Sequence, residues 1–210
     1  LSEHKTIKKK IDGYVFKYIY IPQPIVDADS VISIPVLKTH SLSIMTCAMK
    51  NQWGCLPRFR HNFHDRIHKA IAEINYGLKV HFVVADATVC SEGRGPRNGT
   101  PKIVNSILAS ADRVAIDSAA ARLMGVDPSQ IEYLRRAQKL GVGAINYLLR
   151  GAPIIPVQFE MPDINKMPII KWEMKLRHTQ VIKQILFNTP LFKIFAFLAT
   201  KYNSVWWYHS

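Results

Sequence analysis

An alternation of short apolar segments with helical segments most constrains how this chain folds. Apolar runs stand at residues 31–36, 80–85 and 103–109, and helical patterns lie between and after them. Strands that are covered on both faces have such near-continuous apolar runs. Strands that alternate with helices are typical of a mostly parallel sheet with helices on its faces. The sequence therefore predicts an α/β fold, a mostly parallel sheet with helices on both faces.

Four segments have helical patterns. The clearest places Ile67, Ile71, Ile74 and Leu78 at helical spacing. Two later segments are stopped by glycine, which is common just after a helix C-terminus. The predicted helices cover residues 43–50, 65–78, 114–124 and 129–140.

The two ends of the chain differ from this middle part. Residues 14–21 are rich in β-branched and aromatic types and stop at Pro22, which predicts an edge strand. After residue 150, prolines interrupt the sequence and residues 169–210 are basic and aromatic. We predict a domain at residues 1–150, then a Pro-rich connector and a basic, aromatic C-terminal helical arm at residues 151–210. The arm packs on the domain or on a second subunit of a homo-oligomer, or makes peripheral contact with a membrane.

The charge of the chain favours anionic partners. Lys and Arg number 28 against 15 Asp and Glu, which gives a formal net charge of +13. This excess suits phosphorylated ligands, nucleic acid or an acidic membrane surface and does not choose among them. Because no nucleic-acid recognition motif occurs, we expect no sequence-specific nucleic-acid binding.

Cysteine usage indicates the compartment. The three cysteines, Cys47, Cys55 and Cys90, cannot form a complete set of disulfides, which indicates a reducing environment. Residues 1–10 are polar and basic and do not resemble a signal peptide. The sequence therefore predicts a cytoplasmic protein.

Two basic segments are candidate ligand sites. Lys38, Thr39 and His40 follow an apolar strand, where ligands bind in open α/β sheets. A lysine offers charge to a phosphate or carboxylate, and a histidine transfers protons or binds metal. Lys50 and Asn51 precede a glycine turn and could hold an anion or a carbonyl group. The competing interpretations are a solvated loop with a helix cap, and a cation at a helix C-terminus.

A carboxylate and glycine segment follows the next strand. Asp86 and Glu92 are placed to act as acid, base or metal ligand. Glycines let a backbone approach a ligand closely, which makes Gly93, Gly95 and Gly99 candidate ligand-binding positions. The segment is not a dinucleotide fingerprint, because Pro101 leads into a strand rather than a helix. A structural connection between two strands is the alternative.

Two further groups are less specific. If helical, His61 and His64 share a face and could ligate a metal, although a basic surface explains them equally. Asp112 has the position of a helix N-cap. Asp117 lies in an otherwise apolar helix, where a carboxylate faces solvent, a partner such as Arg122, or a ligand site. Asp117 and Arg122 are therefore both candidate ligand-binding residues.

These segments, in this order, resemble the family known as domain of unknown function 362. The matching pieces are Pro35-Val-Leu-Lys-Thr-His40-Ser41, Ala48-Met-Lys-Asn51 with Gly54-Cys55, the Asp86 strand, Glu92-Gly-x-Gly-Pro-x-x-Gly99, and the segment from Leu108 through Asp112 and Asp117 to Arg122-Leu-Met-Gly125. The resemblance covers residues 27–145. It implies an α/β domain of prokaryotes.

The resemblance also implies an association with redox proteins, because some members carry an added cysteine-rich, ferredoxin-like segment. This chain lacks closely spaced cysteines, so an iron–sulfur cluster held by this chain alone is not expected. Members usually have a longer region before the Lys-Thr-His motif. We therefore expect that Leu1 is not the natural start.

The sequence leaves three functions open and does not decide whether the chain is an enzyme. The first is an enzyme-like domain that binds a small anionic ligand or cofactor, with or without a metal ion. In it, Lys38 and Lys50 neutralise the anion, and His40 with Glu92 or Asp86 handles protons or metal. The second is a redox accessory protein served by a ferredoxin-like partner. The third is a basic binding module without catalysis.

Overall fold

The computed structural model describes residues 4–94 and 98–163 of the chain. By its internal contacts the chain falls into two units, one of Leu1–Arg58 and Arg66–Asp163 and the other of Phe59–Asp65 and Ile164–Ser210. The first unit contains the sheet described below. The predicted C-terminal helical arm lies outside the described residues.

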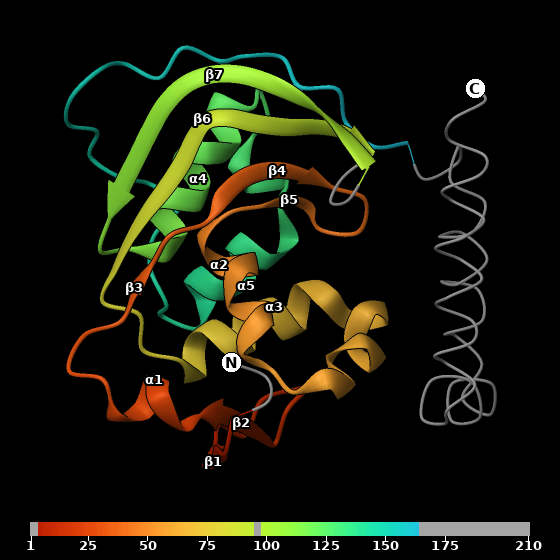
Figure 1. Ribbon diagram of the computed structural model, residues 1–210, viewed down its shortest axis with the longest axis vertical. Helices are drawn as coiled ribbons and strands as arrows, with labels where there is room; N and C mark the ends of the chain where they lie inside the picture. The colour runs from red at the N-terminus through yellow and green to blue at the C-terminus, as the bar shows by residue number, and fades with distance from the viewer. Residues whose placement is uncertain (1–3, 95–97, 164–210) are drawn as a thin grey trace. The chain divides into compact units, whose positions relative to one another are not determined.

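A five-stranded sheet is the centre of the first unit (Figure 1). β3 (Ile32–Ser33) and β4 (Val36–His40) both pair in parallel with β6 (Phe82–Arg94). β5 (Ile44–Thr46) pairs antiparallel with β4, and β7 (Asn98–Ser110) pairs antiparallel with β6. The predicted α/β class with parallel pairing at the centre of the sheet is confirmed, and antiparallel strands extend the sheet on either side.

Pro35 divides the predicted strand at residues 31–36 in two. Proline has no N–H to donate to a sheet, and the strand is interrupted between β3 and β4. The Pro35 carbonyl still accepts a hydrogen bond of 2.8 Å from the Asp86 N–H. β4 then continues to His40. The prediction that Lys38, Thr39 and His40 lie in a loop after the strand is therefore wrong, because they form most of β4 itself.

The predicted helix over residues 43–50 is also wrong in its first half. Ile44–Thr46 folds back on β4 as β5, and the helix α2 covers only Ala48–Asn51, followed by the 3-10 helix η1 (Gln52–Cys55). The β-branched Ile44 and Thr46 favour a strand once β4 offers a pairing edge. That edge is a tertiary feature, which a local pattern does not contain.

β6 and β7 form one long hairpin. The sequence places a strand end at Asp86, but β6 runs on for eight further residues to Arg94. The register shifts between Ala87 and Val89, and opposite this shift Asn105 has a φ of 53°. An irregularity of this kind is a β-bulge, which bends a strand without ending it. The glycine segment therefore joins two strands, as the alternative interpretation expected.

The later helices agree with the sequence. α3 (Ile67–Gly77), α4 (Arg113–Leu123) and α5 (Glu132–Lys139) lie where helices were predicted, with the short η3 (Pro128–Gln130) before α5. Asp112 is the N-cap of α4, and its carboxylate accepts from the N–H groups of Val114 (2.7 Å) and Ala115 (3.0 Å). Gly125 and Gly141 follow their helices with φ of 75° and 74°, a conformation that favours glycine.

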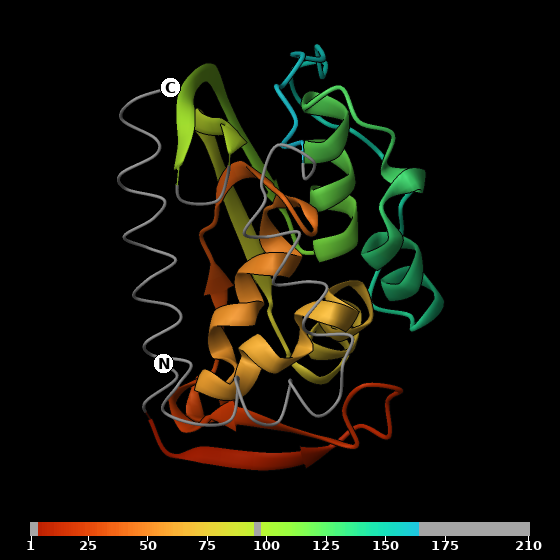
Figure 2. The same ribbon diagram turned by 90° about the vertical axis from the view of Figure 1, so that its right-hand side faces the viewer.

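The helices α2, α3, α4 and α5 lie on one side of the sheet (Figure 2). Strand residues that face them, such as Leu37, Val83 and Ala85, are fully buried. Residues on the other face are exposed, up to 71% for Ile103 and 66% for Ile107. The prediction of helices on the second face is not met within the described residues.

A small hairpin at the start of the chain closes one end of this core. β1 (Thr6–Lys10) and β2 (Tyr18–Pro22) pair antiparallel and lead into α1 (Gln23–Asp27). The buried carboxylate of Glu73 on α3 accepts hydrogen bonds from the N–H groups of Val15 and Phe16. β1 was not predicted, because three consecutive lysines hide its strand pattern.

Candidate functional site

The hairpin of β4 and β5 carries the candidate site. His40 lies opposite Ile44, and Ser41, Leu42 and Ser43 form the turn between them. The Nδ1 atom of His40 accepts hydrogen bonds from the backbone N–H groups of Leu42 (3.1 Å) and Ser43 (3.3 Å). With two donors directed at Nδ1, the ring proton must be on Nε2. The turn thus presents a neutral imidazole whose other nitrogen is an Nε2–H donor.

The surroundings keep this imidazole neutral. The pKa of His40 is lowered to about 3, mostly by burial and then by the positive charges of Lys50 and Lys38, with a smaller effect of His68. Only 7% of the residue is exposed. His40 is therefore uncharged at neutral pH and does not act there as an imidazolium acid. Its fixed tautomer also leaves no lone pair on Nε2 for a metal ion.

The same hairpin holds a strained residue. Ile44 has a φ of 70°, a left-handed conformation that is rare for a β-branched side chain. Such strain persists only where the surroundings enforce it, and it is enriched at functional sites. The position opposite His40 makes this the strongest backbone sign of function in the described chain.

The predicted basic residues lie around His40. Lys38 is half-buried in β4, opposite Thr46 of β5 and Ser91 of β6. Lys50 is in α2, and its Nζ lies 5.1 Å from the ring centroid of Trp53. Both lysines act on the charge state of His40. Lys38 and His40 are thus two residues apart on β4, and Lys50 lies near enough for its charge to lower the pKa of His40.

Thr39 and Asn51 have structural partners. The Thr39 hydroxyl donates to the Gly93 carbonyl over 3.2 Å and is fully buried. It therefore ties β4 to the end of β6. The Asn51 amide donates to the Ser33 hydroxyl over 3.0 Å. Both side chains hold the frame of the site.

Glu92 and Asp86 are also engaged. Glu92 accepts from the Lys102 ammonium and from the Glu160 N–H, each at 2.8 Å. Burial works to raise the pKa of Glu92, but these hydrogen bonds and the Lys102 charge lower it overall. Hydrogen bonds from the Thr88 hydroxyl (2.6 Å) and N–H (2.8 Å) lower the pKa of Asp86. Both groups are ionised at neutral pH and are not poised as acids.

The glycine positions serve the β6–β7 hairpin. Gly93 has a φ of 73°, and its N–H donates to the Glu160 carbonyl over 2.7 Å. A side chain on Gly99 would collide with Ser91 and the Glu92 backbone. These contacts explain why glycine occurs at Gly93 and Gly99. Gly95 lies outside the described residues.

Asp117 is the most deeply buried carboxylate of the predicted set. It is fully buried on α4, and its Oδ2 accepts from the Met49 N–H and the Tyr133 hydroxyl, both at 3.2 Å. Burial raises the pKa of Asp117 to about 7, against the opposing effect of hydrogen bonds from Met49, Cys47, Ala48 and Tyr133. The suggested partner Arg122 is not used, because Arg122 is exposed and lies 4.9 Å from the Tyr147 ring centroid.

The predicted metal ligands belong to another part of the chain. His61 and His64 lie in the 3-10 helix η2 (Arg58–Arg66), not in the α-helix that the spacing suggested. Within the described residues, no group of three His, Cys, Asp or Glu side chains is arranged to hold a metal ion. His68, which follows the same spacing, lies instead in α3.

Sequence reasoning missed two residues of the site, His68 and Tyr133. Their rings stack with centroids 6.1 Å apart and an interplanar angle of 16°. In the sequence, the only signal at His68 is its position four residues after His64. Tyr133 carries no local signal, because an aromatic residue on an amphipathic helix looks like any core residue.

The three cysteines are buried and unpaired. Burial raises the pKa of Cys47 well above its usual range, raises that of Cys55, and raises that of Cys90 to about 11. All three are protonated thiols at neutral pH. A thiolate, not a thiol, is the metal ligand and nucleophile, so these side chains are not poised for either role.

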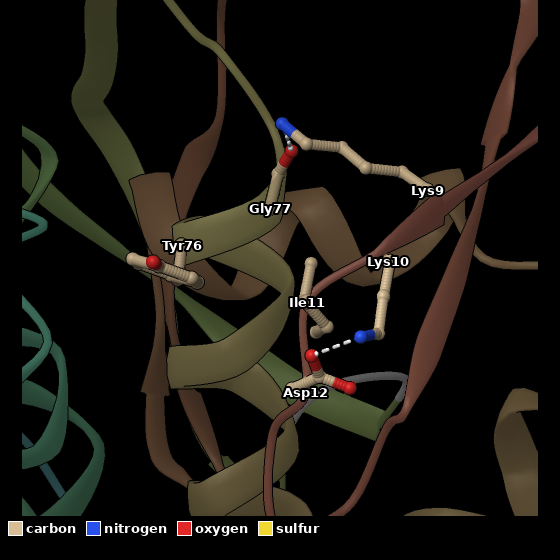
Figure 3. A pocket seen from close by; sticks show the side chains of 6 residues that line it. All are labelled: Lys9, Lys10, Ile11, Asp12, Tyr76 and Gly77. Atoms are coloured by element: carbon tan, nitrogen blue, oxygen red, sulfur yellow. Dashed lines mark hydrogen bonds and ion pairs between the residues drawn. The ribbon is translucent and has the colours of Figure 1, made fainter.

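A separate cavity of about 380 Å³ lies beside the N-terminal hairpin (Figure 3). The Lys9 ammonium there donates to the Gly77 carbonyl over 2.9 Å, and Lys10 forms an ion pair with Asp12 at 2.8 Å. Both ammonium groups are thus engaged with the wall of the cavity itself. It contains none of the predicted site residues, and we assign it no function.

None of the helices in the described part of the chain is long and apolar enough to cross a membrane.

Comparison with known proteins supports the family assignment. A thylakoid-associated protein, sll1697, from Synechocystis sp. (strain PCC 6803) is 28% identical over 139 residues, which are 62% of this chain and 43% of the relative. The chain thus spans less than half the length of that relative. No solved structure matches the chain. The model of the family described as domain of unknown function (DUF362) matches residues 1–122. The family that the motifs indicated is thereby shown, and this chain belongs to the DUF362 family.

Proposed function

We propose that the β4–β5 hairpin binds a small anionic ligand, a phosphate or a carboxylate. Lys38 and Lys50 supply the positive charge, and the Nε2–H of His40 donates a hydrogen bond to the anion. The observation that carries the proposal is the pair of backbone N–H groups on His40 Nδ1, which fixes the ring as an Nε2–H donor. A neutral, oriented donor that is within the electrostatic influence of two lysines is suited to binding an anion.

The state of the candidate carboxylates and cysteines favours the first of the three functions, the binding of an anionic ligand. Glu92 and Asp86 are occupied by Lys102 and Thr88 and serve the sheet, so the chemistry that the site can perform depends on His40. The protonated cysteines give no support to the redox alternative. The cytoplasmic location stays a prediction from the sequence.

The lysines give the direct test. Lys38→Met and Lys50→Met each remove one charge and should weaken the binding of inorganic phosphate by roughly 10-fold to 100-fold, the usual value of a charge-assisted hydrogen bond. Isothermal titration calorimetry on the folded full chain measures the Kd.

Lys79→Met is the matched control. Lys79 is exposed between α3 and β6, so its loss removes the same charge away from the hairpin and should leave the Kd within about twofold. Equal weakening by all three variants would mean that net charge, not this site, attracts phosphate. Unchanged binding in the Lys38 and Lys50 variants would refute the site.

A further inference from the structure

One face of the N-terminal hairpin carries lysines and tyrosines together. β1 and β2 pair antiparallel, with Lys8 opposite Tyr20 and Lys10 opposite Tyr18. Residues that lie directly opposite each other in an antiparallel pair point to the same face of the sheet. These four residues therefore belong to one face of the hairpin, which we call the lysine–tyrosine face.

The second face of the hairpin is turned to the core. Ile19 and Ile21 alternate with the tyrosines along β2 and are only 2% and 7% exposed. Lys9, opposite Ile19, belongs to this inner face, and its ammonium donates to the Gly77 carbonyl at the end of α3 over 2.9 Å. Figure 2 shows the hairpin running across one end of the first unit. The lysine–tyrosine face is consequently turned away from the core.

The hairpin is strongly basic. Residues 4–22 contain five lysines and one acidic residue, Asp12. All five lysines are exposed, and the ion pair of Lys10 with Asp12 is exposed as well. An exposed ion pair stays hydrated and holds its members only weakly. The hairpin therefore presents an excess of positive charge to anything that lies against it.

Lysine ammonium groups cover two of the tyrosine rings. The Nζ of Lys8 lies 4.1 Å from the ring centroid of Tyr18, and the Nζ of Lys69 on α3 lies 3.6 Å from that of Tyr14. Single-stranded nucleic acids bind proteins largely by stacking their bases on open aromatic rings. A ring that is already covered by an ammonium group does not offer that side to a base. This arrangement disfavours nucleic acid as the partner of the hairpin.

The same residue types suit the surface of a lipid bilayer. Tyr14 is 74% exposed and Tyr20 is 37% exposed. Tyrosine has an apolar ring with a polar hydroxyl, and it is enriched where the hydrocarbon of a membrane meets water. The aliphatic stem of a lysine lies along apolar surface while its ammonium reaches the headgroups, and lysines are attracted to anionic lipids.

We propose that the lysine–tyrosine face is a docking surface for an anionic lipid bilayer. Its lysines pair with lipid phosphates, and its tyrosines lie at the boundary between headgroups and hydrocarbon. The loop of the hairpin is fixed to the core, because the Glu73 carboxylate on α3 accepts hydrogen bonds from the N–H groups of Val15 and Phe16. The inference does not depend on the proposed anion site, since no residue of the β4–β5 hairpin takes part in it.

Co-sedimentation of the full chain with lipid vesicles tests the proposal. We expect the wild-type chain to bind vesicles of equal parts phosphatidylglycerol and phosphatidylcholine, and to bind vesicles of phosphatidylcholine alone at least tenfold more weakly. Lys8→Glu reverses one charge on the face and should weaken binding to the mixed vesicles by roughly tenfold to thirtyfold. Tyr18→Thr keeps the net charge and should weaken it about threefold.

Two variants elsewhere are matched controls. Lys139→Glu makes the same charge reversal at an exposed position of α5. Tyr147→Thr removes a half-buried tyrosine whose ring also lies near a cation, 4.9 Å from the Arg122 guanidinium. Both should bind the mixed vesicles within about twofold of wild type. Circular dichroism checks that every variant is folded, and Tyr18→Thr decides the question if Lys8→Glu is not.

The possible failures are distinct. A wild-type chain that does not bind the mixed vesicles, or that binds both kinds of vesicle equally, would overturn the proposal. So would unchanged binding in both hairpin variants, or equal weakening by Lys8→Glu and Lys139→Glu, which would show an effect of net charge. If Lys8→Glu weakens binding to single-stranded DNA and not to vesicles, the partner of the face is nucleic acid and the proposal is wrong.

Phosphate binding separates this proposal from the anion site. Lys8→Glu should leave the Kd for inorganic phosphate within about twofold of wild type, because Lys8 belongs to a different hairpin from Lys38 and His40. A chain that binds vesicles through the lysine–tyrosine face and does not bind phosphate would refute the anion site alone. A chain that binds phosphate and not vesicles would refute the docking surface alone.

Discussion

At the scale of single residues, burial controls the charge of the polar side chains His40 and Asp117. His40 and Asp117 are both almost inaccessible to water, yet burial moves their pKa values in opposite directions, to about 3 and about 7. The reason is that burial disfavours the charged form, which is the acid form of histidine and the base form of aspartate. Each group accepts hydrogen bonds from backbone N–H groups, and Asp117 also accepts one from the Tyr133 hydroxyl.

Asp117 should make the stability of the protein fall as pH rises. Its folded pKa of about 7 lies above its unfolded value, so its contribution is complete below about pH 4 and is lost as pH increases through 7. Asp117→Asn removes this loss and should be more stable than wild type at pH 8 by up to about 4 kcal/mol, with a smaller difference at pH 4.5. Urea unfolding at both pH values measures it.

His40 changes stability with the opposite sign, because its lowered pKa makes stability fall as pH decreases from about 6.5 toward 3. The wild-type curve therefore contains both effects, and only the difference between Asp117→Asn and wild type isolates Asp117. A difference that does not vary with pH would show that Asp117 is ionised in the folded protein throughout this range.

At the scale of elements, local signals decide where helices end, and pairing partners decide where strands end. α4 and α5 stop at glycines with left-handed backbones, as the sequence indicated. β4, β5 and β6 do not follow their local patterns, because each extends or forms only against a neighbour. The candidate site lies in the second class, on a hairpin that forms because β5 pairs with β4.

A glycine pair tests the first rule. Gly141 has a φ of 74° and nothing within 4 Å of where a methyl group would lie, so Gly141→Ala should cost about 1 kcal/mol through the backbone alone. Gly54 has equally open space and no left-handed backbone, so Gly54→Ala should be neutral or slightly stabilising. Thermal unfolding of both variants checks this, and equal effects would contradict it.

At the scale of the whole molecule, the segment after α5 completes the core rather than leaving it. Phe159 is only 2% exposed, the Val157 N–H donates to the Leu123 carbonyl over 2.7 Å, and Glu160 bonds to Glu92 and Gly93. The family match ends at residue 122, so these contacts add to the matched region. They also hold the end of β6 that Thr39 joins to the candidate hairpin.

Phe159→Ala in the full chain should therefore cost about 3–5 kcal/mol, as for other large buried aromatic side chains. Chemical denaturation measures the loss. Ile155→Ala is the control, because Ile155 is 71% exposed in the same segment and its truncation should change stability by less than about 0.5 kcal/mol. Similar losses in both variants would mean that the segment does not pack as described.

The sequence by itself determined the α/β class, the three long helices, the Asp112 cap and the family. These depend on period, capping and glycine chemistry, which are properties of neighbouring residues. It also selected Lys38, His40 and Lys50, since their motif is local. It could not decide that Glu92 and Asp86 are occupied, because Lys102 and Glu160 reach Glu92 from elsewhere in the chain and Asp86 lies at a bulge formed by strand pairing.

Only the tertiary structure decided which nitrogen of His40 carries its proton and which residues support it. Leu42 and Ser43 act on His40 through a turn that exists because β5 pairs with β4. A hydrogen bond depends on distance and direction in space, whereas a sequence records only order. For that reason the charged residues of the candidate site could be predicted from the sequence, and the geometry on which their proposed role depends could not.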